Sequence, residues 1–211
     1  MKTKNIAIII LAALLAVASV LAAMWYPAGN DEDTTEASGQ PDEIMKYRMA
    51  NELLISNAKA HYTYEGTKLD DFTITAIPSG EQALFSSILD GRYRLVFKTS
   101  PLNCQACINA ELGNIERFAK KIGGGNRITI LVEGSSTREI QAFMKDRNLG
   151  INVYKVPKGA MNGMLIKENT PFLCLVDSSM RADQVFVPIK EIPVFAGCYY
   201  NNIYERFFKS E

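Results

Sequence analysis

The stretch that decides the fold of this chain reads Leu95-Val96-Phe97-Lys98-Thr99-Ser100-Pro101-Leu102-Asn103-Cys104-Gln105-Ala106-Cys107. It begins as a short apolar strand, passes through a turn rich in Ser, Pro and Asn, and reaches two cysteines where a helical pattern starts. The C-x-x-C spacing puts both sulfurs on one face of the first helical turn, close enough to bond to each other. Free backbone N–H groups and the positive end of the helix dipole stabilise a thiolate there and lower its pKa. The stretch therefore predicts a nucleophilic thiol with a second thiol beside it.

The segments that follow alternate between strands and helices. After the cysteines, apolar residues spaced three or four apart predict one helix, which the glycine run at 123–125 ends. Ser136 and Glu139 form a capping-box pattern for a second helix through Met144. Strands are predicted at 94–99, 128–132, 153–156, 172–176 and 184–187, and a last helix at 199–209. This order predicts an α/β fold with a central mixed sheet.

The segments before this core carry weaker patterns. Acidic residues at 42–43 and an imperfect apolar stripe predict a helix over about 44–57. Residues 66–74 alternate as a strand does, and 83–89 is a short, apolar, helical piece. His61 is the only histidine, and the sequence shows no triad-like partner for it. We therefore expect His61 to be a surface or packing residue.

Composition fits one globular domain with an appendage. The chain has 211 residues, 47% of them hydrophobic, and 23 Lys and Arg residues against 23 Asp and Glu residues. This length is sufficient to bury a real core. Because the charges balance, nothing in the composition predicts a nucleic-acid partner.

The appendage is the N-terminus. Residues 6–24 carry no charge and are almost entirely Ile, Leu, Ala and Val. They are long enough to cross a bilayer, which takes about 20 apolar residues. Lys2 and Lys4 precede this run and only acidic charges follow it closely, so the positive-inside bias places the N-terminus in the cytoplasm. We expect residues 1–26 to be a signal anchor, a single transmembrane helix in the cell membrane.

Two further expectations concern the exported part. Residues 27–41 are mostly Gly, Asn, Asp, Glu, Thr and Ser and predict a flexible acidic linker. Residues 42–211 then form the domain, on the periplasmic or other extracytoplasmic side. The alternative is a signal peptide cleaved near Ala18 or Ala23, which would leave the same domain secreted.

Two more cysteines lie in the second half of the chain. Cys174 falls in a predicted buried strand, and Cys198 falls in a predicted turn before the last helix. Free cysteine is often buried as a small apolar residue, which is the expectation for both. A second disulfide or a redox relay remains open as the alternative.

These residues together resemble the thioredoxin superfamily, in particular its redoxin branch of exported, membrane-tethered thiol–disulfide oxidoreductases. The likeness covers about residue 65 to the end. It rests on the cysteine pair after a strand, on segment 66–74, which is similar to the first hairpin of redoxins, and on Thr170-Pro171 leading into the strand 172–176. Asn103 stands where many members of the family carry Trp.

The resemblance implies a thioredoxin-like three-layer sandwich and a role for each site residue. Cys104 would be the attacking thiolate and Cys107 the resolving thiol. Pro171 would be a cis-proline beside the cysteines, with the backbone of Thr170 pairing with a bound peptide. The redox-active disulfide Cys104–Cys107 would serve in place of a cofactor, and no metal is expected. The implied partners are cysteine-containing exported proteins, such as apocytochromes, or a redox partner protein, together with the lipid bilayer at residues 6–24.

The sequence also leaves other functions open. No Lys, Arg or His lies within three residues of Cys104, so the helix terminus must supply most of the pKa shift unless the fold brings Lys98 near. The pair could instead be a static disulfide, although so small a loop restrains little of the unfolded chain. A peroxiredoxin-type peroxidase would have Thr or Ser where Pro101 stands. A non-catalytic binding or metal-handling module is the third alternative; copper-carrying relatives use C-x-x-x-C and a later histidine, whereas His61 comes earlier.

Overall fold

The computed structural model describes residues 40–144, 150–161, 164 and 170–209. The chain divides into two units, residues 1–47 and 48–211. Of the first unit the structure describes residues 40–47, which form the beginning of a long helix, α2 (Gln40–Tyr64). The remaining described residues belong to the second unit.

Helix α2 is longer than the sequence indicates. It was expected over about 44–57, but it runs from Gln40 to Tyr64 and so begins two residues before the predicted domain boundary at 42. Pro41 is compatible with this start because a first-turn proline has no intrahelical N–H bond to lose. The predicted anchor, residues 1–26, lies outside the described residues, and no helix within the described part combines the length and apolar character of a membrane span.

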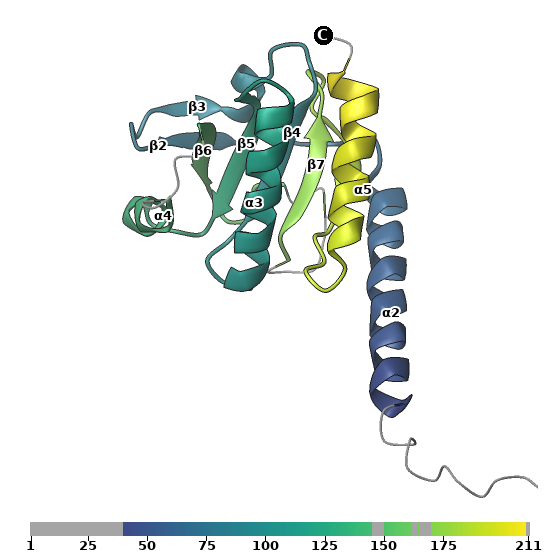
Figure 1. The fold of residues 1–211 in the computed structure, drawn as a ribbon. Coiled ribbons are helices and arrows are strands. Elements are labelled where there is room, and N and C mark those ends of the chain that lie inside the picture. The colour runs from purple at the N-terminus through teal and green to yellow at the C-terminus, as the bar shows by residue number, and fades with distance from the viewer. Residues whose placement is uncertain (1–39, 145–149, 162–163, 165–169, 210–211) are drawn as a thin grey trace, which may run out of the picture. The chain divides into compact units, whose positions relative to one another are not determined.

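The described residues contain eight strands in one mixed sheet (Figure 1). In chain order the strands are β1 (Thr67–Lys68), β2 (Thr73–Ile77), β3 (Gln82–Leu84), β4 (Arg94–Thr99), β5 (Gly125–Glu133), β6 (Ile151–Val156), β7 (Phe172–Val176) and β8 (Arg181–Phe186). Their order across the sheet is β1-β8-β7-β4-β5-β6-β2-β3. Strands β4, β5 and β6 are parallel, and the other neighbours are antiparallel. The predicted α/β fold with a mixed central sheet is confirmed.

The N-terminal part of the sheet differs from the prediction. Segment 66–74 was expected to be one strand, but β1 and β2 divide it and pair near opposite edges of the sheet, with β8 and β6 respectively. The chain crosses from one side of the sheet to the other between these two strands, and Leu69 is buried in this crossing segment. Segment 83–89 was expected to be helical, but it begins in β3 and continues as a short 3-10 helix, η1 (Phe85–Ile88).

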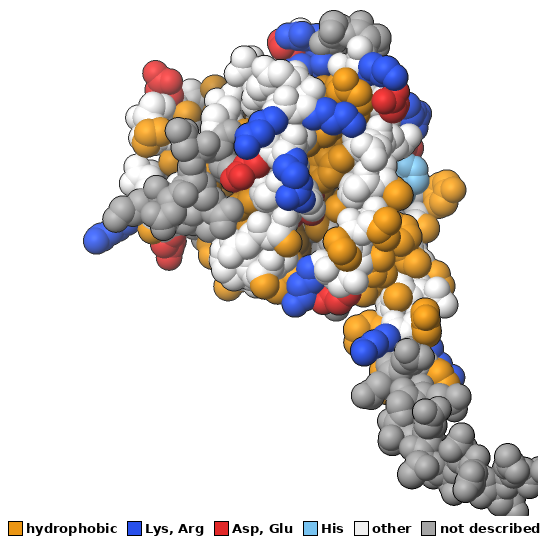
Figure 2. All heavy atoms as spheres, in the orientation of Figure 1, with side chains coloured by type: hydrophobic (Ala, Val, Ile, Leu, Met, Phe, Trp, Pro, Cys, Tyr) orange, Lys and Arg blue, Asp and Glu red, His pale blue; other side chains and the backbone are white. Residues whose placement is uncertain are grey.

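Charged side chains are dispersed on the face shown in Figure 2. Lys and Arg side chains lie singly or in small groups, with Asp and Glu side chains among them. This face therefore carries no extended patch of one sign, in keeping with the balanced charge of the whole chain.

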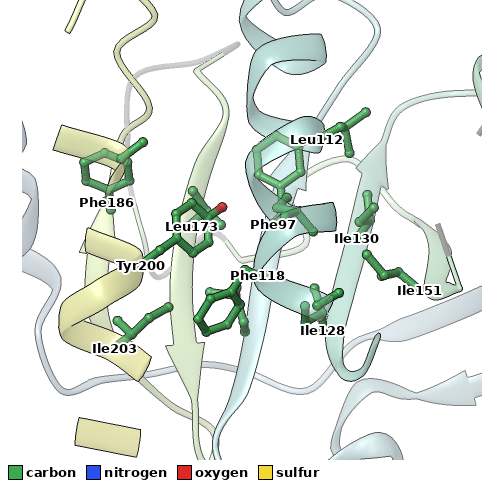
Figure 3. Packing of buried hydrophobic residues seen from close by; sticks show 14 of the residues in the cluster. Phe97, Leu112, Phe118, Ile128, Ile130, Ile151, Leu173, Phe186, Tyr200 and Ile203 are labelled. Carbon is green, nitrogen blue, oxygen red and sulfur yellow. The ribbon is translucent and has the colours of Figure 1, made fainter. Parts of the chain in front are cut away.

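One face of the sheet is covered by three helices, α3 (Gln105–Lys121), α4 (Thr137–Met144) and α5 (Pro193–Ile203). Alternate strand residues such as Leu95 and Phe97 point to this face and pack with Ile108 of α3, Ile140 of α4 and Ile203 of α5. Figure 3 shows side chains of this cluster meeting between the sheet and the helices. Complete burial of a side chain such as Phe97 contributes about 1.5–3 kcal/mol.

The opposite face has its own apolar cluster but a different cover. Val96, Leu131 and Cys174 point to this side. Among the described residues they are covered by loop and turn side chains, by Phe85 of η1 and by Tyr64 at the end of α2. The implied sandwich is thus helical on one face, while the described cover of the other face consists mainly of short connecting segments.

The ends of the helices agree with the sequence prediction in one case and differ from it in two. The capping box at Ser136 and Glu139 is confirmed, because each backbone N–H donates to the other side chain, at 2.7 and 3.2 Å. Helix α3 ends at Lys121, so the last glycine of the run at 123–125 already belongs to β5. Helix α5 begins at Pro193, six residues earlier than predicted, because proline suits a first helical turn, and a turn of π-helix, η2 (Tyr204–Phe208), follows it.

Candidate active site

The sheet register brings four connecting segments together at one end of the strands, the end where β4 and β5 finish. This end of the sheet is called the edge below. Strands β4 and β5 are parallel and end together, at Thr99 and Glu133. Strand β7 runs antiparallel to β4, with Phe172 opposite Lys98, so it begins where β4 ends. Strand β8 is antiparallel to β7, with Phe186 opposite Leu173, so it ends at this same edge. The edge therefore gathers the segments 100–104, 134–136, 170–171 and 187–192.

The turn between β4 and α3 is fixed by Asn103. Its side chain is buried, and Oδ1 accepts hydrogen bonds from the backbone N–H of Ser100 (2.6 Å) and the hydroxyl of Thr99 (3.0 Å). The backbone N–H of Asn103 also donates to the carbonyl of Ser100 at 3.1 Å. Asn103, which stands where many redoxins carry Trp, therefore holds the turn in shape and presents the next residue, Cys104, at the start of the helix.

Cys104 is the N-cap residue of α3 and is exposed. Its Sγ accepts a hydrogen bond from the backbone N–H of Cys107 at 3.4 Å. The Cys107 thiol, this backbone N–H and the positive charge of Lys190 together hold the pKa of Cys104 below its usual range. The sequence prediction assigned the main part of this shift to the helix terminus, whereas the thiol of Cys107 is the larger influence and the backbone N–H the second.

Cys107 has the opposite properties. It is half-buried on the first turn of α3, and its thiol is free, as is that of Cys104. Burial, followed by the neighbouring Cys104 sulfur, raises the pKa of Cys107 to about 11. The pair therefore consists of one exposed sulfur that loses its proton readily and one shielded sulfur that keeps it.

The cation near the pair is Lys190, not Lys98. Lys98 forms an ion pair with Glu133 and lies over the ring of Phe172, 5.9 Å from its centroid. Lys190, in the segment before α5, lowers the pKa of both cysteines and lies 3.6 Å from Glu191. Sequence reasoning missed Lys190 because only the order of the strands brings its segment to this edge.

Thr170 and Pro171 lie in the segment that the register brings to the same edge. Pro171 is buried and Thr170 is half-buried, immediately before β7. The expectation of a cis-proline is not met: the cis peptide bond recorded among the described residues is Ile77–Pro78, and Thr170–Pro171 is not cis. A Thr-Pro pair does not by itself impose the cis form, because the trans form is favoured by about 0.5–1 kcal/mol.

The other two cysteines are free and differ from each other. Cys174 is completely buried in β7, as predicted, and burial raises the pKa of its thiol. Cys198 is exposed, so the expectation that it is buried was wrong. It lies within α5 rather than in a turn, on a part of the helix that does not face the sheet. His61 is half-buried, in keeping with the prediction of a surface or packing residue, and its Nδ1 lies 3.4 Å from a carboxylate oxygen of Glu65.

Large apolar side chains are exposed near the cysteine pair. Leu102, in the turn, is 78% exposed, and Val194, in the first turn of α5, is 66% exposed. Phe195 beside it is partly exposed. Exposed apolar groups that cluster near a reactive residue are typical of a surface that contacts another protein.

The difference between the two sulfurs predicts selective alkylation. At pH 7 the thiolate fraction of Cys104 exceeds that of Cys107, because the pKa of Cys104 is lowered and the pKa of Cys107 is raised to about 11. The less basic thiolate is also the weaker nucleophile, which offsets part of this advantage. We therefore expect iodoacetamide to modify Cys104 at least about tenfold faster than Cys107. Peptide mass spectrometry of the reduced protein after timed quenching measures both rates. The ratio should fall as the pH rises, because Cys107 ionises later; equal rates at neutral pH would contradict the assignment.

Comparison with known proteins adds evidence on the fold. No protein-family model and no curated protein matches the chain. Among solved structures, a thiol:disulfide interchange protein from Bacteroides sp. is 16% identical with a TM-score of 0.52, over 69% of this chain and 91% of that one. The thioredoxin domain of a thiol-disulfide oxidoreductase from Bacteroides vulgatus is 14% identical with a TM-score of 0.50, over 68% and 97%. Copper-bound Sco1 from yeast is 15% identical with a TM-score of 0.52, over 70% and 96%. The predicted thioredoxin-like fold is therefore confirmed.

Proposed function

We propose that this chain, a thioredoxin-like domain with two unequal cysteines at the start of α3, is a thiol–disulfide oxidoreductase that acts on cysteines of exported proteins. The proposal rests mainly on one observation: the two cysteines differ in exposure and in pKa. The exposed Cys104 sulfur is held at a helix N-terminus by a backbone N–H, while Cys107 is shielded and protonated one turn further on. A static disulfide needs no such difference between its two sulfurs.

The asymmetry supports a two-step exchange. The Cys104 thiolate attacks one sulfur of a substrate disulfide, forming a mixed disulfide and releasing one substrate thiolate, which takes up a proton. Cys107 then loses its proton and attacks the Cys104 sulfur, which closes the Cys104–Cys107 disulfide and releases the second substrate thiolate. The substrate gains two electrons and the pair loses two. The same steps in reverse oxidise a substrate dithiol.

A protein substrate is favoured by the surroundings of the pair. Leu102, Val194 and Phe195 offer exposed apolar contacts at this edge. The buried Pro171 and the half-buried Thr170 belong to the same edge by strand register, and we propose that the backbone of Thr170 pairs with the substrate chain. The trans Thr170–Pro171 bond does not prevent this, because the pairing would use backbone groups of Thr170.

We further propose that residues 6–24 tether the domain to the cell membrane with its active site outside the cytoplasm. The support is the uncharged run after Lys2 and Lys4 and before an acidic segment. Fractionation of cells that express the full chain tests this: a tethered chain stays in the membrane pellet after a carbonate wash and is cut by protease added to spheroplasts. Recovery of a shorter, soluble form outside the cytoplasm would establish signal cleavage instead.

The exchange itself is tested by trapping. In a Cys107→Ser variant the first step can occur but the resolving thiol is missing, so mixed disulfides between Cys104 and client proteins should accumulate. Non-reducing electrophoresis followed by mass spectrometry identifies them, and a variant that also carries Cys104→Ser should trap nothing. Rapid peroxide consumption by the wild type would favour a thiol peroxidase, and copper that copurifies in stoichiometric amount would favour a metal-handling module. The absence of both client adducts and insulin reduction would exclude the proposal.

A further inference from the structure

A pocket of about 440 Å³ lies beside the cysteine pair, on the side of α3 that faces α4. It is placed over the ends of β4 and β5, with Thr99 and Val132 at its base and Gln105, the residue after Cys104, at its rim. Lys190 and Val194 belong to the segments that follow β8, on the other side of β4 in the strand order. The pocket is therefore a second surface next to the nucleophile, distinct from the exposed Val194 and Phe195 on α5.

Two serines that line this pocket have hydroxyls without a partner. Ser100 and Ser135 are 8% and 4% exposed, and each Oγ is closed off from solvent. Neither Oγ has a hydrogen-bond partner among the described residues. Buried hydroxyls are usually hydrogen-bonded, so two unpaired ones in one pocket wall need an explanation. A serine side chain turns about a single torsion, so a hydroxyl that is closed off in one staggered position can point in another direction when a partner is present.

The rest of the lining selects an uncharged occupant. Ile108 of α3 and Ile140 of α4 give the pocket an apolar wall. Among the residues that line it, Glu139 is the one with a charge, and its carboxylate is already bound to the hydroxyl and backbone N–H of Ser136. An anionic group would meet this carboxylate without any lysine or arginine in the lining. An apolar side chain with the peptide groups beside it would find both an apolar wall and two hydroxyls.

We infer that this pocket binds an uncharged segment of the substrate polypeptide next to its reacting cysteine. The segment places an apolar side chain against Ile108 and Ile140, and its peptide groups exchange hydrogen bonds with Ser100 and Ser135. The inference rests on the proposed exchange activity and adds its substrate class: protein disulfides with neutral, apolar flanking residues, in preference to anionic disulfides of low molecular weight.

Two peptide disulfides test the pocket. Each short peptide carries one cysteine as a mixed disulfide with thionitrobenzoate, flanked by Leu and Thr in one peptide and by Asp on both sides in the other. Wild-type reduced protein should react with the Leu/Thr peptide at least about tenfold faster. Asn109→Trp, at the exposed rim of the pocket, should bring the ratio of the two rate constants close to one. Ala110→Trp is the matched control, because this neighbouring position is exposed on α3 but does not line the pocket.

The Ser135→Ala variant distinguishes a role of this serine in substrate binding from a purely structural role. In the free protein its hydroxyl has no partner to lose, so the thermal midpoint should stay the same or rise. In the complex the hydroxyl bonds the substrate, so the rate constant for the Leu/Thr peptide should fall about fivefold relative to the Asp peptide. An unchanged ratio in both Asn109→Trp and Ser135→Ala would overturn the inference while leaving the exchange activity intact. Failure of the wild type to react with either peptide, or with neutral 2-hydroxyethyl disulfide, would instead overturn the proposed function.

Discussion

Cys104→Ser is expected to abolish thiol–disulfide exchange, lowering its rate on the order of a thousandfold or more. Exchange requires a thiolate, and a serine hydroxyl provides no comparable nucleophile near neutral pH. The fold should not suffer, because serine is a favourable N-cap residue whose Oγ can accept the backbone N–H that Cys104 Sγ now accepts from Cys107. Reduction of insulin disulfides by the variant, with its thermal midpoint as a check of folding, measures the effect.

Cys198→Ser is the matched control for this prediction. Cys198 is also free and exposed, but it lies within α5 and is not part of the cysteine pair. Its replacement should leave the exchange rate unchanged, since no step of the proposed reaction uses it. Exchange that survives Cys104→Ser but is lost in Cys198→Ser would place the nucleophile on α5 and reject the assignment made here.

The part of the site that the sequence predicts well is local in the chain. Strand, turn and helix follow one another from Leu95 to Lys121, and each is specified by neighbouring residues: a short apolar run, a turn, then a helical stripe. The capping box at Ser136 and Glu139 is correct for the same reason, because its two partners are three positions apart.

The part that the sequence does not predict depends on which strands become neighbours. Lys190 influences the cysteines because β8 ends beside the start of β7, and no local pattern marks this contact. Lys98 is the nearer cation in sequence, but its partner, Glu133, lies on β5. Likewise, the two unpaired hydroxyls at Ser100 and Ser135 share a pocket only because β4 and β5 are parallel neighbours.

A buried carboxylate between α3 and α5 also escaped the sequence reading. Glu111 lies one helical turn after Cys107 and is 2% exposed. It accepts hydrogen bonds from the hydroxyl of Tyr200 on α5 and, at 3.1 Å, from the side-chain amide of Asn114. Burial raises the pKa of Glu111 above its ordinary value of 4.5, although both hydrogen bonds oppose the shift. Tyr200 therefore does two things: it joins the two helices and it partly compensates a buried charge.

The raised pKa of Glu111 determines how stability depends on pH. Because the folded protein holds this proton more tightly than the unfolded chain does, the contribution of Glu111 is most favourable below pH 4.5. It is lost as the pH rises from there through the raised pKa of the folded state. Glu111→Gln removes this ionisation and keeps an acceptor for Tyr200, so its effect on the free energy of unfolding should become more stabilising as the pH rises through that window.

We expect Tyr200→Phe to lower the free energy of unfolding by about 2 kcal/mol at neutral pH, because it leaves a buried carboxylate oxygen without its donor. Urea unfolding at pH 7 measures the change. Tyr199→Phe is the adjacent control: the Tyr199 hydroxyl is shielded from solvent and has no partner among the described residues, so its removal should be neutral or stabilising. Opposite signs for the same chemical change in neighbouring residues would isolate the hydrogen bond to Glu111.

The double variant Tyr200→Phe with Glu111→Gln tests whether Tyr200 and Glu111 stabilise the protein through each other. If Tyr200 acts by compensating a buried charge, its loss should cost less when that charge is absent, so the two effects should not add. Additive effects would mean that the Tyr200 hydroxyl stabilises the protein independently of the charge on Glu111, because the ring, whose centroid lies 5.1 Å from that of Phe118, is kept in the variant. Helix α3 begins directly after Cys104 and α5 begins three residues after Lys190, so this hydrogen bond joins the two helices that follow the nucleophile and the nearby cation. The two larger influences on Cys104, the thiol and the backbone N–H of Cys107, stay in place in Tyr200→Phe, so the pKa of Cys104 should remain below its usual range, which the pH dependence of its alkylation rate would reveal.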